Sequence, residues 1–449
     1  MNDRPVLFLL HALGGSARAW DGVAAALGTG FDPVAIDLPG FGDECAAPDL
    51  TVSDLADHVA TAVRARGASR WLLVGHSMGG KIASIVASRA LAGEQGLFGL
   101  AGVVLLAASP PSPEPMDDDR RNEMIGWAAH GSLDAAAARA FIDGNVGHPL
   151  DAAADRRAVE DLERTSREAW LAWLERGSRE DWSKEVGTLD LPALIVVGGA
   201  DGDLGEAGQH ATNAKVYPRA RIEVEEGAGH LLPLERPREV AGRIARFWRE
   251  LAGTGPGVPE AFARLIASAR VSRRTRAALA VRVLADDPQR APETLSPRQL
   301  STLRALAERI VPQTGSSIDL AARLDAQLAA GKGDGWRFED LPPDREAHVL
   351  ALDSLAGFDT QTEDQQQARL TDLAEGRFEG ATLSAAQMAH WFEDLRADLV
   401  RLWLGHPATM ARIGFDGFAN GGDGPRKQGF ERLAAGERET WEPLVEVTQ

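Results

Sequence analysis

The stretch Gly75-His76-Ser77-Met78-Gly79-Gly80 decides the interpretation of the first half of the chain. An apolar run at residues 71–74, typical of a buried strand, precedes it, and a helical pattern at 81–91 follows it. This is the G-x-S-x-G arrangement, in which a tight strand-to-helix turn exposes a serine hydroxyl. The flanking glycines are needed because a Cβ at either position would clash where strand and helix pass closely. Since the chain has 47 glycines, the motif needs support from its context.

Six short apolar runs in the first 250 residues alternate with helical patterns. Continuous apolar runs are typical of parallel strands that helices cover on both faces, so we expect a mostly parallel α/β sheet. The expected strands are residues 6–10, 31–36, 71–74, 103–107, 194–197 and 221–224. Residues from about 110 to 191 show no strand signal and have helical patterns at 135–142 and 153–175, which predicts a helical lid. Four tryptophans in this stretch either line a pocket or anchor the lid.

The groups that a serine nucleophile needs follow it in the chain. A serine hydroxyl becomes reactive when a histidine removes its proton, and a carboxylate orients that histidine. Asp201 comes directly after the fifth expected strand, and His230 comes after the sixth. Both should therefore lie at the same edge of the sheet as Ser77, in the order Ser, Asp, His. Asp203 shares the loop and remains the alternative acid.

An oxyanion hole requires two backbone N–H groups beside the nucleophile. Met78, the residue after the serine, supplies the first. The loop at residues 11–16 follows the first strand, and Leu13 in this loop is the candidate for the second. His11 and His76 lie beside tight turns, where a ring nitrogen usually satisfies nearby backbone groups, so we do not assign them as bases.

Five motifs in order give residues 5–251 a resemblance to the α/β-hydrolase superfamily, in its group of small lid-bearing esterases and related lyases. The motifs are residues 11–16, 37–42, 75–80, 198–201 and 227–237. The segment Gly229-His230-Leu231-Leu232-Pro233-Leu234-Glu235-Arg236-Pro237 is similar to the histidine loop of that family. One departure is Ala12, where many members have glycine. A serine at position 77 speaks against haloalkane dehalogenases and epoxide hydrolases, which have an aspartate there.

The resemblance implies a carboxylesterase-like serine hydrolase that cleaves a small-molecule ester, thioester or lactone through an acyl-enzyme. Such a reaction requires no cofactor. Relatives with the same triad perform carbon–carbon cleavage or a lyase step, and the sequence does not separate these from ester hydrolysis. A further alternative is an accessory or scaffold subunit of a flavoprotein oxidoreductase complex. The intact set of triad residues argues against a purely structural role.

A Gly/Pro cluster at residues 253–259 predicts a linker after a first domain of residues 1–252. Every later apolar segment has helical spacing, so the α/β-hydrolase fold should be followed by an all-α domain at about 260–449. We expect helices at 260–269, 273–285, 297–310, 318–330, 345–355, 364–375 and 384–404. Ser296 and Ser384 are suitable N-caps. The Gly-rich tail from residue 405 should be irregular.

The helical half resembles a second family, gluconate 2-dehydrogenase subunit 3, in residues 295–313, 390–396 and 406–422. That family provides the small helical subunit that accompanies a flavin-dependent dehydrogenase. The resemblance implies that residues 260–449 bind a separately encoded flavoprotein of the glucose–methanol–choline type. The chain has no dinucleotide-binding fingerprint, because the Gly-rich loop at 414–424 lacks the required strand and helix. Any flavin would belong to the partner.

Length, net charge and residue composition exclude several further classes of protein. The 449 residues suggest about three domains, or two with an insertion, and the net charge of −18 argues against a nucleic-acid partner. The single cysteine, Cys45, excludes an internal disulfide framework, and His348, His390 and His406 lack metal-ligand spacing. No stretch approaches the ~20 apolar residues of a membrane span, and residues 1–10 show no basic leader. We therefore expect a soluble cytoplasmic protein without a metal site.

Overall fold

The computed structural model describes residues 4–45, 50–333, 335–415, 417–418, 423 and 434–437. Packing divides the chain into two compact units. The first comprises Met1–Gly253, Val258–Leu284 and Gly417–Gln449, and the second comprises Thr254–Gly257 and Ala285–Asp416. The first unit holds the sheet and the predicted lid.

Six parallel strands form one sheet in the order β2-β1-β3-β4-β5-β6. Their bounds are β1 Val6–Leu10, β2 Asp32–Ile36, β3 Trp71–His76, β4 Leu100–Leu106, β5 Ala193–Gly198 and β6 Ala220–Glu225. The four central strands are buried along their whole length, as their continuous apolar sequences predict. The predicted parallel sheet is therefore confirmed.

Helices cover both faces of the sheet, and alternate side chains of β1 show this division. Leu7 and Leu9 pack in one apolar cluster with helices α1 (Asp21–Leu27) and α12 (Pro237–Phe247). Phe8 and its neighbours on the other face pack with α2 (Val52–Arg66) and α3 (Met78–Leu91). The unit also contains four shorter helices, which are α8 Ser183–Val186, α9 Glu206–Ala211, α10 Asn213–Val216 and α11 Leu232–Glu235.

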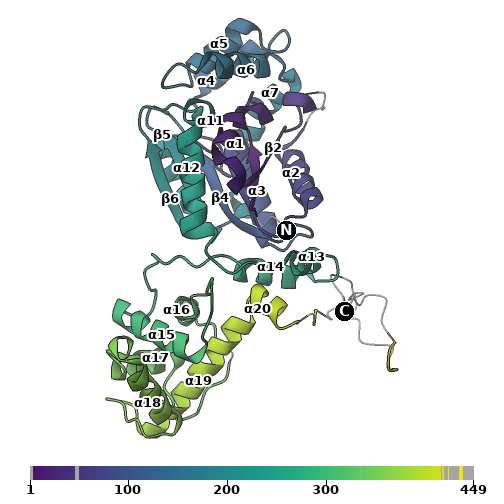
Figure 1. The fold of residues 1–449 in the computed structure, drawn as a ribbon. Coiled ribbons are helices and arrows are strands. Elements are labelled where there is room, and N and C mark those ends of the chain that lie inside the picture. The colour runs from purple at the N-terminus through teal and green to yellow at the C-terminus, as the bar shows by residue number, and fades with distance from the viewer. Residues whose placement is uncertain are drawn as a thin grey trace. The chain divides into compact units, whose positions relative to one another are not determined.

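The lid consists of four main helices that gather at one end of the sheet (Figure 1). They are α4 Asp118–Trp127, α5 Ala135–Asp143, α6 Ala152–Glu163 and α7 Arg167–Glu175. The helical pattern at 153–175 corresponds to two helices, α6 and α7, because the helix is interrupted before Ser166. The Ser166 hydroxyl caps α7 by accepting from the Ala169 N–H at 3.2 Å, and the Ser166 N–H donates to the Gly40 carbonyl at 2.9 Å.

Two helices after the predicted linker pack within the first unit, α13 (Glu260–Ala267) and α14 (Arg273–Arg282). The Gly96 N–H donates to the Ala267 carbonyl at 2.9 Å, and Arg276 Nε donates to the Gly93 carbonyl at 2.7 Å. The boundary between the two packed units thus lies after α14, between Leu284 and Ala285, and not only at the predicted linker 253–259. The Gly/Pro cluster marks a break in secondary structure, whereas these hydrogen bonds hold the next two helices to the first unit.

The second unit is helical, which confirms the predicted change of fold class. Its helices are α15 Pro297–Ile310, α16 Leu320–Ala329, α17 Asp344–Ser354, α18 Glu363–Ala374, α19 Ala385–Leu404 and α20 Pro407–Arg412. Ser296 and Ser384 form capping boxes at the starts of α15 and α19. The helix α20 corrects the prediction of an irregular tail from residue 405. Residues 416, 419–422 and 424 of the Gly-rich loop lie outside the described residues.

Within the described ranges, no helix combines the length and the apolar character that crossing a bilayer requires.

Candidate active site

Ser77 occupies the turn between β3 and α3 with φ 49° and ψ −118°. A positive φ is strained for a residue with a side chain and persists only where the surroundings enforce it. A Cβ on Gly75 would lie 2.5 Å from the Gly79 carbonyl oxygen, and one on Gly79 would lie 2.5 Å from the Leu10 carbonyl oxygen. Glycine at both positions therefore allows the close approach that holds the serine on this turn.

The loop after β4 is fixed to the same turn. The Ser77 N–H donates to the Leu106 carbonyl, and the Ser109 N–H donates to the Ser77 carbonyl, both at 3.0 Å. A Cβ on Gly80 would lie 2.3 Å from the Cβ of Ala108, so this contact also requires glycine. The segment that begins at Ser109 thus has a defined position relative to Ser77.

His230 and Asp201 meet at the carboxyl ends of β6 and β5. His230 Nδ1 donates to Asp201 Oδ2 at 2.9 Å, and the two side chains are 13% and 8% exposed. Because the carboxylate only accepts, this bond fixes the tautomer and leaves Nε2 free to accept a proton. Asp203 is exposed, and no described hydrogen bond joins it to His230. The structure therefore brings Asp201 to His230, and not Asp203.

The lid fixes the loop that carries His230. The Asn145 carbonyl accepts from the His230 N–H at 2.8 Å. The Glu235 carboxylate accepts from the Gly229 N–H at 2.9 Å and from the Gly147 N–H at 2.8 Å. Sequence reasoning gave no role to Asn145 or Glu235, since neither contact could be read from spacing along the chain.

The surroundings of His230 change its affinity for a proton in opposing ways. Burial lowers the pKa of His230, while the charge and hydrogen bond of Asp201 raise it, with further contributions from the charges of Glu114 and Glu235. The net result is a raised pKa. The protonated imidazole is therefore stabilised at this position.

His11 and His76 pair with backbone groups, as predicted. The Leu38 N–H donates to His11 Nε2 at 3.0 Å, and His11 Nδ1 donates to the Ala12 carbonyl at 2.7 Å. His76 Nε2 donates to the His230 carbonyl at 2.8 Å, and burial lowers the pKa of His76 to about 3. Both rings are consequently neutral structural groups.

Ser77, His230 and Leu13 line one cavity of about 220 Å³. No described hydrogen bond joins Ser77 to His230, and none is donated by the Leu13 N–H. Met78 is the first residue of α3, so its N–H has no partner within the helix. Ser77, His230 and Leu13 thus lie around one space, and Met78 directly follows Ser77 at the start of α3.

One of the four lid tryptophans, Trp173, lines this cavity. Trp170 is fully buried and donates from Nε1 to the Met124 carbonyl at 2.9 Å, and Trp127 packs against it with ring centroids 6.5 Å apart. Trp173 therefore lines the cavity, whereas Trp170 and Trp127 anchor the lid helices. Further side chains that line the cavity are Glu114, Met116, Arg120, Phe141 and Leu204.

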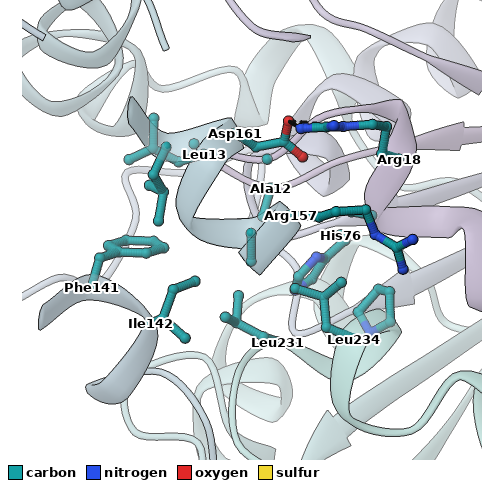
Figure 2. A pocket seen from close by; sticks show the side chains of 16 residues that line it. Ala12, Leu13, Arg18, His76, Phe141, Ile142, Arg157, Asp161, Leu231 and Leu234 are labelled. Atoms are coloured by element: carbon teal, nitrogen blue, oxygen red, sulfur yellow. Dashed lines mark hydrogen bonds and ion pairs between the residues drawn. The ribbon is translucent and has the colours of Figure 1, made fainter. Parts of the chain in front are cut away.

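A second pocket of about 40 Å³ adjoins the cavity, because Leu13 and Phe141 border both. Figure 2 shows the side chains around it, among them Leu13, Phe141, Ile142, Leu231 and Leu234. Its lining is largely apolar, and the pair of Arg18 and Asp161 lies at its border. An apolar substituent of a ligand in the main cavity could extend past Leu13 into this space.

Lys81 connects helix α3 to the lid. Its side chain is fully buried, and Nζ donates to the carbonyls of Gly177 at 3.1 Å and Glu180 at 2.8 Å. Burial lowers the pKa of Lys81 to about 8. A lysine within an otherwise apolar helix pattern was the available signal for this role, and sequence reasoning did not use it.

The histidines of the second unit have structural partners. His348 Nδ1 donates to the Asp344 carbonyl at 2.9 Å, and His406 Nδ1 accepts from the Ala408 N–H at 3.1 Å. In the part of the chain that the structure describes, no three His, Cys, Asp or Glu side chains are grouped so as to hold a metal ion.

Two families match the chain. Residues 7–243 match the alpha/beta hydrolase family, and residues 297–417 match gluconate 2-dehydrogenase subunit 3. Both matches confirm the resemblances that the motifs indicated.

Curated relatives match parts of the chain. The 2-succinyl-6-hydroxy-2,4-cyclohexadiene-1-carboxylate synthase of Serratia proteamaculans is 35% identical over 108 residues, or 24% of this chain and 40% of that protein. The pimeloyl-(acyl-carrier protein) methyl ester esterase of Sodalis glossinidius is 36% identical over 104 residues, or 23% and 37%. The matched segments span less than half of either relative.

Among solved structures, a thermophilic esterase from Thermogutta terrifontis is similar to this chain. It is 24% identical, with a TM-score of 0.46, over 55% of this chain and 89% of that chain.

Proposed function

The chain belongs to the alpha/beta hydrolase family, and on that premise we propose that it hydrolyses carboxylic ester, thioester or lactone bonds with Ser77, His230 and Asp201 as its catalytic triad. The observation that carries the proposal is the shared cavity of Ser77 and His230, together with the 2.9 Å bond from His230 to Asp201. A strained serine beside an oriented imidazole is the arrangement that acyl transfer requires.

The first half of the reaction forms an acyl-enzyme. His230 Nε2 accepts the proton of Ser77 Oγ as the oxygen attacks the carbonyl carbon of the substrate. The N–H groups of Met78 and Leu13 stabilise the negative charge on the carbonyl oxygen. The carbon–oxygen or carbon–sulfur bond then breaks, and His230 returns the proton to the leaving group.

The second half releases the acid. His230 accepts a proton from a water molecule, which attacks the acyl carbon, and the proton then returns to Ser77 Oγ as the ester bond to the enzyme breaks. Asp201 stabilises the imidazolium in both halves and keeps Nδ1 as the donor. No cofactor takes part.

A second candidate is a lyase or carbon–carbon cleavage step with the same triad, since the Serratia relative is named as a synthase and not as a hydrolase. A panel of p-nitrophenyl esters and sugar lactones separates the candidates. Turnover of esters or lactones that depends on Ser77 supports hydrolysis, whereas no turnover across the panel contradicts it.

On the acidic side of the pH–activity profile, activity should begin to fall at a higher pH than it would with a histidine of ordinary pKa. His230 must be neutral to accept the serine proton, so activity falls as the pH drops below its pKa, which is raised above the ordinary value of 6.5. As the pH is lowered, kcat/KM for a neutral ester should fall to half of its plateau value at a pH that is still above 6.5. Glu235→Gln should move this midpoint downward, since Glu235 contributes to the raised pKa. A wild-type midpoint below 6.5 would contradict the account.

The second unit is proposed to bind a flavoprotein of the glucose–methanol–choline type, because residues 297–417 match a subunit of a dehydrogenase. Oxidation of a cyclic hemiacetal yields a lactone, and a serine hydrolase opens lactones. One chain would then hold both activities together, with an effective concentration of about millimolar order. A pure accessory subunit would show no turnover that depends on Ser77, and this distinguishes it from the proposed hydrolase.

Co-expression of the full chain with a flavoprotein encoded beside it tests this binding. We expect the two to elute from a size-exclusion column as one yellow complex, since the flavin belongs to the partner. Removing residues 285–449, which leaves α13 and α14 in the first unit, should abolish co-elution, while Ser77→Ala should leave it unchanged. Separate elution of the full chain and the flavoprotein would contradict the proposal.

A further inference from the structure

Glu114 is a buried carboxyl group in the catalytic cavity that the proposed mechanism does not use. It lines the same cavity as Ser77 and His230, and it is only 8% exposed. Carboxyl groups are almost never this buried unless they are paired or functional. The partners of this carboxyl therefore decide its role.

Glu114 has a fixed position relative to the nucleophile. The Ser109 hydroxyl donates to Glu114 Oε2 at 2.5 Å, and the Ser109 N–H donates to the Ser77 carbonyl at 3.0 Å. The backbone N–H of Glu114 donates to the Ser178 carbonyl at 2.7 Å. One hydrogen bond thus orients the Glu114 carboxyl group and another fixes its backbone, so the residue is preorganised for binding.

One oxygen of Glu114 remains available. Among the described residues, Oε1 accepts no hydrogen bond, and Glu114 forms no ion pair. The nearby cations are used elsewhere. Lys81 Nζ donates to lid carbonyls, and Arg121 Nη1 donates to the Leu174 carbonyl at 3.2 Å and to the Ser178 hydroxyl. The carboxyl is thus not the missing half of a structural ion pair.

We infer that Glu114 binds a hydroxyl group of the substrate and makes the enzyme selective for hydroxylated acyl groups, such as those of hydroxylated lactones. This rests on the proposed hydrolase function and specifies its substrate class. A hydroxyl donates to a carboxylate and accepts from a carboxylic acid, so it suits Glu114 in either state. A buried group that hydrogen-bonds a substrate hydroxyl disfavours analogues without one.

Charge around Glu114 favours a neutral partner. An ionised Glu114 repels a substrate carboxylate, whereas the charges of Lys81 and Arg121, which act on Glu114, and of Arg120 in the cavity lining disfavour a substrate ammonium. Burial raises the pKa of Glu114, and the Ser109 hydrogen bond opposes this change. A hydroxyl avoids both electrostatic penalties.

The test compares γ-butyrolactone with 2-hydroxy-γ-butyrolactone, and δ-valerolactone with D-glucono-1,5-lactone. Each kcat/KM is divided by the rate of hydroxide hydrolysis of the same lactone, which removes differences in intrinsic reactivity. We expect the wild type to prefer the hydroxylated member of at least one pair by about tenfold or more. Glu114→Leu should reduce this preference to near unity, and Glu114→Gln should retain part of it.

Glu168→Leu is the matched control, because Glu168 accepts from the Ser166 hydroxyl at 3.1 Å but is exposed on the lid. It should leave the preference at the wild-type value. Equal normalised turnover within both pairs, or the same preference in Glu114→Leu as in the wild type, would overturn the inference. A stronger preference for the charged 2-amino-γ-butyrolactone would also overturn it. If the wild type turned over no lactone or ester, the proposed function itself would fail.

Discussion

Replacing Ser77 with alanine should lower kcat/KM for an activated ester by about 10⁴- to 10⁶-fold. The loss is large because the alanine variant forms no acyl-enzyme, while substrate binding and the oxyanion donors persist. Initial rates with p-nitrophenyl acetate, corrected for hydrolysis without enzyme, measure it.

Ser88→Ala provides the control for this loss. Ser88 lies on the same helix, and its hydroxyl donates to the Glu185 carbonyl at 3.3 Å. Ser88 does not line the cavity that Ser77 and His230 share, so turnover should stay within a few-fold of the wild type. Equal activity of Ser77→Ala and Ser88→Ala would contradict the assignment of the nucleophile.

Replacing Asp201 with asparagine should lower kcat by about 10⁴-fold without unfolding the protein. The amide would present a donor or a neutral acceptor to His230 Nδ1, so the tautomer with a free Nε2 would lose its stabilisation. Thermal denaturation of both proteins, measured beside the rates, shows that the loss is not one of folding.

Asp203→Asn is the matched control within the same loop. Asp203 is exposed and has no described bond to His230, so its amide variant should retain turnover within a few-fold. If Asp203→Asn were inactive and Asp201→Asn active, the assignment of the acid would be wrong.

Much of the first unit could be predicted from its sequence because local patterns determine it. A continuous apolar run of five residues, as in Val6–Leu10, gives a strand covered on both faces. The glycines at 75 and 79 mark a turn whose backbone contacts leave no room for a Cβ. Chain order then predicted that Asp201 and His230 lie together, since both follow parallel strands.

Contacts between segments far apart in the chain could not be predicted. Asn145 and Glu235 hold the histidine loop across the lid, and Lys81 donates to carbonyls nearly a hundred residues later. No periodicity reports such pairs. Glu114 was missed for the same reason, because its place in the cavity depends on how the segment after β4 folds back on the nucleophile turn.

Helix boundaries could not be predicted where a single side chain ends one helix and caps the next within a continuous helical pattern. Residues 153–175 have a continuous helical pattern, but Ser166 caps a new helix and divides it in two. Serine favours such caps over helix interiors because its hydroxyl bonds to the backbone. The linker composition similarly predicted where the chain becomes irregular, but not that α13 and α14 pack in the first unit.

The most direct test of the central claim is the mass of the intact protein after reaction with a fluorophosphonate probe. An activated serine forms a covalent phosphonyl ester with the probe, whereas ordinary serines do not react. The account predicts one adduct per chain, carried by the peptide that contains Ser77 and absent from Ser77→Ala. An unmodified wild-type protein, or an adduct that persists in Ser77→Ala, would contradict it.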